Sequence, residues 1–370
     1  MIYLDNGATS FHKPPQVKQA VLNAMERCAN PGRGGYRAAM EAARALYDCR
    51  EAAGKLFHCS PEQVVLTGNC THGLNIAIRS MVRPGDEVVV SGFEHNAVVR
   101  PLYALGAKVT VAGRKLFDWD DNLEQWEAVL KKRPKAAVFT HVSNVFGYIL
   151  PVRELGELCR RYGVPFIVDA AQSAGSIPID LETLGADFIA MPGHKGLLGP
   201  QGTGLLLCAR TPEPLLYGGT GGDSMNRQMP SELPDRAEAG TANVPGAAGL
   251  TAGLRYLQRT GVESIGKREM IQADRCAREL KKQGFRVFTG EHRGGTLSFV
   301  PQTDCEEAAE AFARNGIALR AGLHCAPLAH ESAGTLETGT LRLSFGHDAN
   351  PNQTQRFLQA VKRLKQSSEI

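Results

Sequence analysis

One lysine of this chain lies in a turn that is unusual for a surface residue. An apolar run, Phe188–Met191, is followed directly by Pro192-Gly193-His194-Lys195-Gly196. A rigid, close-approach backbone suits a lysine that must reach a carbonyl or an aldehyde, whereas a surface lysine needs no such frame. A solvated loop lysine is nevertheless the simpler interpretation of this turn taken alone. The residues at the other strand ends therefore decide between the two.

An aspartate ends another apolar run, at Phe166-Ile167-Val168-Asp169. A carboxylate in this position is costly to bury unless it faces a cation. The protonated ring nitrogen of pyridoxal phosphate is one such cation, and an aspartate is a known partner for it. The pattern therefore indicates a cofactor-binding acid at the end of this strand.

Two further strand ends carry polar residues. In Thr67–Gly73 a strand and a glycine turn lead into a helical pattern, so backbone N–H groups and the Thr71 hydroxyl can hold a phosphate. Simple capping of the helix by Thr71 is the alternative. His95 follows the apolar run Val88–Val90 and can stack on a ring or move protons, although a hydrogen-bonded loop histidine is more common. Together with Lys195 and Asp169, these parts match what pyridoxal phosphate requires.

With these residues in order, the sequence closely resembles the class V aminotransferase-like, fold-type I pyridoxal-phosphate enzymes, and among them the cysteine desulfurases and selenocysteine lyases. The resemblance covers nearly the whole chain. Its motifs are Tyr3–Thr9, Thr67–Gly73, Glu94–Asn96, His141–Asn144, Val168–Gln172, Gly193–Lys195, Arg320–Cys325 and Leu341–Ser344.

The resemblance implies a role for each matching residue. Lys195 would carry the cofactor in covalent linkage and move the α-proton, Asp169 would pair with the pyridine nitrogen, and His95 would stack on the ring. The other implied cofactor contacts are Cys70, Thr71 and His194 around the phosphate, Gln172 at the ring hydroxyl, Asn144, and Thr241, which would reach the phosphate of the partner subunit in a homodimer. The implied substrate contacts are Asn144, Arg320 and Arg342, with Arg342 gripping the α-carboxylate. Metal ligation is not expected.

Two positions depart from the family pattern. Pro192 stands where these desulfurases usually carry a phosphate-binding serine, and Cys70 stands where a threonine is common. Both changes remove a hydroxyl from the predicted phosphate site.

Cys325 separates this chain from ordinary aminotransferases. It lies in the loop Gly322–Pro327, where a thiolate stabilised by Arg320 or His324 can attack a sulfur atom of the substrate. An inert, small apolar residue is the alternative. The 17 positions from Cys325 to Arg342 form a short connection, which resembles the group II (Suf-type) enzymes.

The resemblance thus implies a cysteine desulfurase that converts L-cysteine to L-alanine and leaves the sulfur on Cys325 as a persulfide for an acceptor protein, as in iron–sulfur cluster assembly. Selenocysteine lyase is one alternative. Another is a class V aminotransferase or epimerase in which Cys325 is not catalytic, and a non-enzymatic scaffold is the least favoured.

Composition agrees with a small-molecule enzyme. The 370 residues are 43% hydrophobic and 22% charged, with a formal charge of +4 that is too small and dispersed to favour nucleic acid. The sequence lacks a signal-peptide pattern and a long apolar segment, so no membrane association is expected. Nine cysteines without a C-x-x-C pair favour a reducing cytoplasm.

The elements that must position these residues are expected to form an α/β fold, with a largely parallel sheet flanked by helices and a smaller α/β carboxyl-terminal domain. We expect a large domain over residues 1–250, whose first ~15 residues form an arm packing on a small domain over residues 251–370. The expected strands of the large sheet are 64–66, 87–90, 107–111, 136–139, 164–168, 187–190 and 204–207. Residues 217–245 are expected to form loops.

Overall fold

The computed structural model describes residues 1–32, 34–222 and 224–370. Its largest sheet has seven strands in the order β2-β8-β7-β6-β5-β3-β4. Their bounds are β2 (Val64–Thr67), β3 (Glu87–Ser91), β4 (Lys108–Ala112), β5 (Ala136–Thr140), β6 (Phe166–Asp169), β7 (Phe188–Pro192) and β8 (Gly204–Cys208). All seven expected strands are present, with shifts of one or two residues at their ends.

The expectation of a largely parallel sheet is confirmed, and β8 is the exception. It runs antiparallel to both of its neighbours, β7 and β2, whereas the other neighbouring pairs are parallel. Only residues 193–203 connect β7 to β8, which is too short for a parallel crossover. The Lys195 turn is part of this short connection, so both of its ends are held by the sheet.

Helices cover both faces of the sheet because its strands are apolar on both sides. Val88 and Val90 of β3 pack with Leu74 of α3 (Cys70–Met81) on one face, together with α4 (Asn96–Ala104). Val89 packs on the opposite face. The helices of that face are α2 (Arg37–Phe57), α5 (Trp119–Leu130), α6 (Val152–Tyr162), the short α7 (Leu181–Leu184) and α8 (Val244–Thr260), with η1 (Pro61–Gln63) beside α2 and α1 (Pro15–Arg27) packed across α8.

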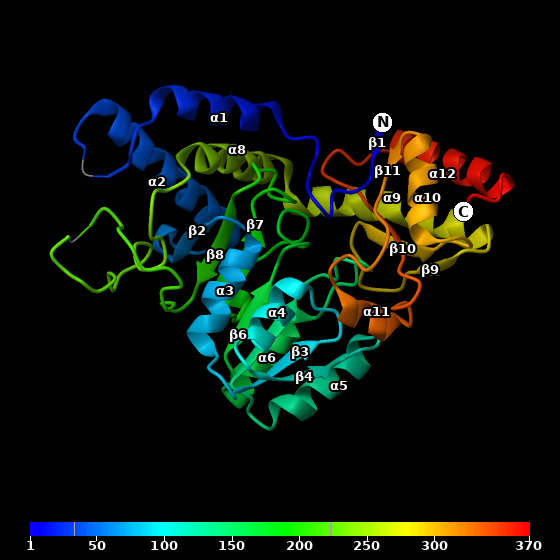
Figure 1. The fold of residues 1–370 in the computed structure, drawn as a ribbon, viewed down its shortest axis with the longest axis horizontal. Helices are drawn as coiled ribbons and strands as arrows, with labels where there is room; N and C mark the ends of the chain where they lie inside the picture. The colour runs from blue at the N-terminus through cyan, green and yellow to red at the C-terminus, as the bar shows by residue number, and fades with distance from the viewer. Residues whose placement is uncertain (33, 223) are drawn as a thin grey trace.

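A second hydrophobic core surrounds a three-stranded antiparallel sheet of order β12-β10-β9. These strands are β9 (Arg286–Phe288), β10 (Thr296–Val300) and β12 (Leu341–Ser344). The helices around them are α9 (Val262–Lys282), α10 (Cys305–Arg314) and α12 (Pro351–Gln366), whereas the short α11 (Pro327–Ala333) packs on the core of the large sheet through Ala329 and Ala333. Figure 1 shows α9, α10 and α12 on the right, away from the large sheet. This second group supplies the loop that carries Cys325.

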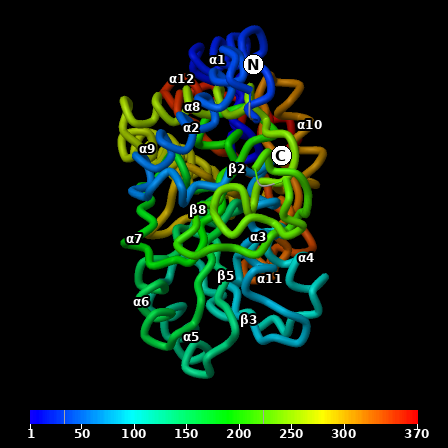
Figure 2. The backbone as a smooth tube through the Cα atoms, turned by 90° about the vertical axis from the view of Figure 1, so that its left-hand side faces the viewer, coloured from blue at the N-terminus to red at the C-terminus, as the bar shows by residue number. Residues whose placement is uncertain are grey.

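The amino-terminal segment belongs to this second group. Its strand β1 (Ile2–Tyr3) pairs in parallel with β11 (Ile317–Ala318), and Ile2 and Leu4 are part of the second core. Figures 1 and 2 place α5 and α6 at the far end of the molecule from α1 and the amino terminus. The segment therefore crosses from the second core to the large sheet before α1 begins.

We propose that the domain boundary lies at Gly261, about ten residues beyond the expected position. Leu250, Leu254 and Leu257 of α8 are buried in the core of the large sheet, whereas Ala273 and Leu280 of α9 are buried in the second core. Ile265, in the first turn of α9, is still part of the core of the large sheet, so the two cores divide near the start of α9.

The long connection between β8 and α8 contains no helix or strand in the part that the structure describes, as expected for residues 217–245, of which Asp223 lies outside that part. The apolar spacing predicts a helix at about Ala247–Gln258, and α8 begins three residues earlier because the Asn243 side chain accepts a hydrogen bond from the Gly246 N–H and caps it. Among the described residues, no helix has both the length and the apolarity needed to cross a membrane.

Candidate active site

The carboxyl ends of the central strands surround a cavity of about 110 Å³. Asp169 at the end of β6 pairs with Thr140 at the end of β5, and Lys195 follows β7. The cavity is lined by Asn69, Cys70, Thr71, His95, Ala97, Thr140, Val142, Asn144, Asp169, Ala171, Gln172, Pro192, His194 and Lys195. The fold thus gathers eight of the predicted cofactor contacts in one place. Thr241 and the predicted substrate residues Arg320 and Arg342 do not line this cavity.

Two glycines fix the turn that presents Lys195. A methyl group on Gly193 would overlap with the Thr203 hydroxyl, and one on Gly196 would overlap with the Ala174 carbonyl oxygen. Neither position tolerates a side chain without movement of the backbone. The close approach predicted for this turn is therefore enforced by its neighbours on both sides.

The surroundings of Lys195 make its amine less basic than that of an exposed lysine. Burial lowers the pKa of this amine, and the nearby Asp169 carboxylate raises it by a smaller amount. A neutral amine can attack an aldehyde and can accept a proton, which an ammonium group cannot.

The carboxylate of Asp169 is 2% exposed and is held on one side by fixed donors. Its Oδ1 atom accepts hydrogen bonds from the Ala171 N–H at 2.9 Å and from the Cys70 thiol at 3.5 Å. Burial raises the pKa of this thiol well above its usual value, so it stays protonated as a donor. Cys70 therefore contacts Asp169, the residue predicted to pair with the ring nitrogen of the cofactor. The sequence analysis placed Cys70 at the phosphate and did not predict this contact.

The amino end of α3 is capped by Asn69, whose side chain accepts a hydrogen bond from the His72 N–H at 2.9 Å. The alternative in which Thr71 caps this helix is therefore wrong. Asn69 takes that role because it precedes the helix, whereas Thr71 is already inside it. The exposed Thr71 side chain keeps its hydroxyl beside the free backbone N–H groups of the first turn.

His95 caps the next helix and has a defined tautomer. Its Nδ1 atom accepts a hydrogen bond from the Ala97 N–H at 3.0 Å, so the proton of the neutral ring is on Nε2. Burial lowers the pKa of His95, while Asp169 raises it and Lys195 lowers it. The ring is thus a neutral, oriented wall of the cavity.

The amino-terminal segment closes the site from the side of His194. The His194 Nδ1 atom lies 3.0 Å from the Thr9 hydroxyl, and the Gln172 side chain donates to the Gly7 carbonyl at 2.9 Å. Burial, with the charges of Lys195 and Lys13, lowers the pKa of His194 to about 4. His194 is therefore neutral near pH 7 and offers a hydrogen-bond donor or acceptor, without a charge.

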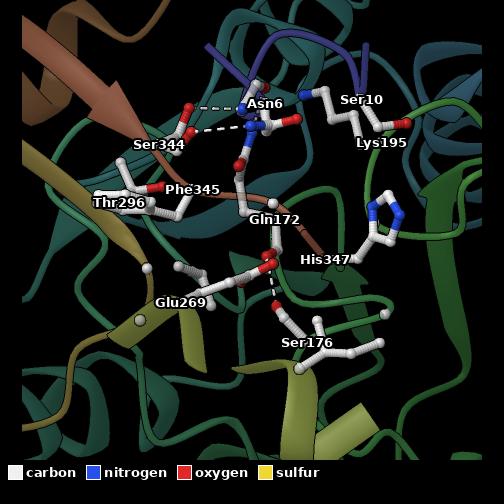
Figure 3. Close-up of a pocket in the computed structure, with 18 of the residues that line it drawn as sticks. Asn6, Ser10, Gln172, Ser176, Lys195, Glu269, Thr296, Ser344, Phe345 and His347 are labelled. Atoms are coloured by element: carbon white, nitrogen blue, oxygen red, sulfur yellow. Dashed lines mark hydrogen bonds between the residues drawn. The ribbon is translucent and has the colours of Figure 1, made fainter. Parts of the chain in front are cut away.

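A second pocket shares Lys195 and Gln172 with the first and lies between the large sheet and the second core. Figure 3 shows Asn6 and Ser10 of the amino-terminal segment on one side of it and Glu269 of α9 on another. The Asn6 amide donates to the Ser344 carbonyl at 3.1 Å, which fixes the segment to β12. Residues from three distant parts of the chain thus meet beside Lys195.

Arg342 of β12 is 2% exposed and is held in a fixed orientation. Its Nη2 atom lies 2.6 Å from the Asp5 carboxylate, and its Nη1 atom donates to the Asn144 carbonyl at 3.0 Å. Its buried Nε atom has no hydrogen-bond partner among the described residues. A buried guanidinium with an unused donor is suited to a carboxylate ligand.

Cys325 is the one exposed cysteine among the nine, all of which lie in the described ranges. Cys325 and His324 both have positive φ angles, of 57° and 50°, which is a strained conformation for residues other than glycine. The Cys325 carbonyl accepts a hydrogen bond from the Asn96 N–H at 2.8 Å, next to His95. The thiol is thus in a loop that is tied to the large sheet, close to the wall of the cavity.

The prediction that His324 supplies positive charge to this thiol is wrong. Burial and the charge of Arg342 lower the pKa of His324 to about 2, so its ring is neutral at any working pH. Arg320, which is exposed, remains the basic residue of that prediction.

Two acidic residues at the site carry no role in the sequence interpretation. Asp5 holds Arg342, and the buried Glu94 accepts hydrogen bonds from the Ser91 hydroxyl and the Thr140 N–H, which ties β3 to β5. Both residues lie in motifs that the chain shares with the family it resembles. Their contact partners, however, are distant in sequence and become visible only in the folded structure. Among the described residues, no group of three or more His, Cys, Asp or Glu side chains is arranged to hold a metal ion.

Comparison with known families matches residues 2–357 to the model of the aminotransferase class-V family. The chain therefore belongs to that family.

Its relatives in the family have a more specific name. A probable cysteine desulfurase of Methanothermobacter thermautotrophicus is 34% identical, over 98% of this chain and 94% of the relative. One of Pyrococcus abyssi is 31% identical, over 99% and 95%. Among solved structures, an apo cysteine desulfurase from Thermococcus onnurineus superposes with a TM-score of 0.92 at 31% identity, over 99% of this chain and 95% of that one.

Proposed function

We propose that this protein is a pyridoxal-phosphate-dependent cysteine desulfurase. The observation that supports it best is the exposed Cys325, whose strained loop is tied to the wall of the cavity that contains Lys195, Asp169 and His95. The names of the family relatives support the same function. They also favour it over an aminotransferase or epimerase in which Cys325 has no role.

The residues of the cavity fit the cofactor. The Lys195 amine, whose pKa burial lowers, suits its aldehyde, the buried Asp169 carboxylate suits its ring nitrogen, and the His95 ring suits its face. The exposed Thr71 hydroxyl and the free N–H groups of α3 suit its phosphate. The missing serine at position 192 leaves this end of the site with fewer hydroxyl donors than the family pattern. When bound, pyridoxal phosphate supplies an electron sink for the bonds at the α-carbon of an amino acid.

The protein would bind and orient the substrate through Arg342, whose unused Nε donor takes the α-carboxylate. The Lys195 amine would remove the α-proton and return a proton to the product. The Cys325 thiolate would attack the substrate sulfur, forming an S–S bond while the C–S bond of the substrate breaks. The electron pair of the broken bond stays with the carbon fragment, which takes up protons and leaves as alanine.

Mass spectrometry of the holoenzyme after incubation with L-cysteine tests this proposal, with alanine measured in the same samples. We expect a mass gain of one sulfur on Cys325 and none in Cys325→Ala, while Cys59→Ala, a change at another accessible cysteine, behaves like the parent. Lys195→Ala should lose the covalent linkage to the cofactor, seen in its absorption spectrum. Undiminished alanine formation by Cys325→Ala would contradict the proposed role of the thiol.

A homodimer in which Thr241 reaches the partner's cofactor belongs to the same proposal. Thr241 is exposed, lies outside the Lys195 cavity and lines a neighbouring pocket with His72. Large apolar side chains on α1, α2 and the long β8–α8 connection are exposed, namely Leu22, Met25, Met40, Tyr47 and Tyr217. Large exposed apolar side chains favour a protein interface. Light scattering should give a dimer mass, and Thr241→Ala should weaken cofactor binding; a monomer that retains full cofactor affinity would exclude this arrangement.

A further inference from the structure

We propose that His324 is a neutral clamp that holds the backbone of Cys325, and that Asn144 connects this clamp to the substrate-binding Arg342. The inference rests on the proposed function and adds a positioning role to it. His324 would act through the position of the thiol, without contributing charge and without touching the reacting atoms.

The hydrogen bonds of His324 define its state. Its Nε2 atom lies 3.1 Å from the Thr340 carbonyl oxygen and 3.2 Å from the Thr340 hydroxyl. A carbonyl oxygen can only accept, so the ring proton is on Nε2 and points across the loop to Thr340, the residue that precedes β12. Within the described residues, the buried Nδ1 atom has no hydrogen-bond partner. The Nε2–H group of the ring is therefore a donor to Thr340.

The clamp acts on a strained segment. Because His324 and Cys325 both have positive φ angles, the loop would relax to a more common conformation if it were not held. Four contacts hold it: the ring of His324 on Thr340, the Asn144 amide on the His324 carbonyl, the Asn96 N–H on the Cys325 carbonyl, and the Gly322 and Thr340 backbones on each other. Only the first of these depends on the His324 side chain.

Asn144 extends the network to the substrate site. The side-chain amide of Asn144 donates a hydrogen bond to the backbone carbonyl of His324 at 2.7 Å. The backbone carbonyl of Asn144 accepts a hydrogen bond from Nη1 of Arg342 at 3.0 Å. One residue thus contacts both the loop of the thiol and the guanidinium predicted to bind the substrate carboxylate. A carboxylate that draws Arg342 toward it would also move Asn144, and with it the backbone at His324.

The charged groups around His324 agree with a neutral role. Those that affect it are Arg342, Arg320 and the buried His330, whose ring centroid is 5.8 Å away. All of them disfavour a second positive charge, and burial adds to the effect. In the described part of the chain, the charged groups that affect the ring include no anion.

The test uses His324→Asn and Thr340→Val in the holoenzyme. Asparagine tolerates a positive φ angle but is too short to reach Thr340 in the same way, and valine removes only the hydroxyl. Thr335→Val is the matched control, because Thr335 is equally buried and its hydroxyl contacts the other buried histidine, His330. Its loss disturbs a neighbouring histidine without touching the loop of Cys325.

Two measurements need no turnover. The first is alkylation of Cys325 by iodoacetamide as a function of pH. We expect the same pH midpoint in His324→Asn as in the parent, because a neutral ring contributes no charge to the thiol. The second is hydrogen exchange of the Asn96 amide, which bonds to Cys325. Its protection should fall about tenfold or more in His324→Asn, less in Thr340→Val, and not in Thr335→Val.

Kinetics of alanine formation supply the third measurement. A misplaced nucleophile lowers kcat by up to about 100-fold while KM changes little. A higher pH midpoint of alkylation in His324→Asn would overturn the proposal, since it would make the histidine a charged partner. Unchanged exchange at Asn96 would also overturn it. If the proposed function itself were wrong, the parent would form no persulfide, whereas the alkylation and exchange results would still stand.

Discussion

Replacement of Glu94 by glutamine should stabilise the protein increasingly as the pH rises. Glu94 is completely buried beneath His95, and burial raises the pKa of its carboxyl from 4.5 to about 8. The hydrogen bonds from Ser91 and the Thr140 N–H reduce this shift without cancelling it. Glutamine keeps the accepting oxygen for both donors and removes the ionisable proton.

The magnitude follows from proton linkage. Between pH 4.5 and about 8 the unfolded chain has lost the Glu94 proton while the folded protein retains it, so the parent loses stability as the pH rises. At pH 7 the carboxyl is about 2.5 pH units above its unfolded pKa, and each unit is worth about 1.36 kcal/mol. The advantage of Glu94→Gln over the parent should therefore grow by roughly 3 kcal/mol between pH 4.5 and 7, and level off above pH 8.

Urea unfolding of both holoproteins at half-unit steps from pH 5 to 9 measures this difference. Any effect of the amide on packing shifts the difference equally at every pH, so the slope is the informative quantity. Glu94→Ala is the control: it removes the acceptor for two donors and should destabilise the protein throughout. A difference between glutamine and parent that stays flat across the range would refute the view that Glu94 is buried as a neutral acid.

Two further changes probe the site. Asp5→Asn removes the carboxylate that lies 2.6 Å from Arg342, so the guanidinium loses its fixed orientation. We expect the KM for the amino-acid substrate to rise about tenfold, with a smaller change in kcat. Steady-state kinetics checks this, and a loss confined to kcat would contradict it. Gly196→Ala places a methyl group against the Ala174 carbonyl and should displace the Lys195 turn, lowering the melting temperature and weakening cofactor binding. Gly284→Ala, at an open but positive-φ position, is its control for backbone effects, and equal loss of cofactor binding in both variants would exclude a local cause.

Much of the fold could be predicted because its elements are locally encoded. The strands at 64–67, 87–91 and 136–140 each contain a continuous apolar run, at 64–66, 88–90 and 136–139, which identifies strands buried on both faces. The predicted ends were less accurate, as in α8, where the capping residue Asn243 lies outside the apolar pattern. The antiparallel direction of β8 follows from the short connection between β7 and β8. The apolar residues of the strand do not indicate its direction.

The site could be predicted only in part, for a different reason. Lys195, Asp169 and His95 each follow a strand, so the rule for parallel sheets brings them to one edge. His324 was misjudged because its neighbour in sequence is Cys325, whereas its hydrogen-bond partner in space is Thr340. Its burial, which removes its charge, has no local signature.

The sequence by itself determined which chemical groups are present and which strand ends carry them, since side-chain type and periodicity are local properties. Tertiary structure alone decided their state. It placed Asp5 on Arg342 across 337 positions of the chain, turned Cys70 toward Asp169, and left the His324 ring neutral beside an exposed thiol. Charge and orientation depend on burial and on partners that are distant in sequence, and folding is what brings those partners together.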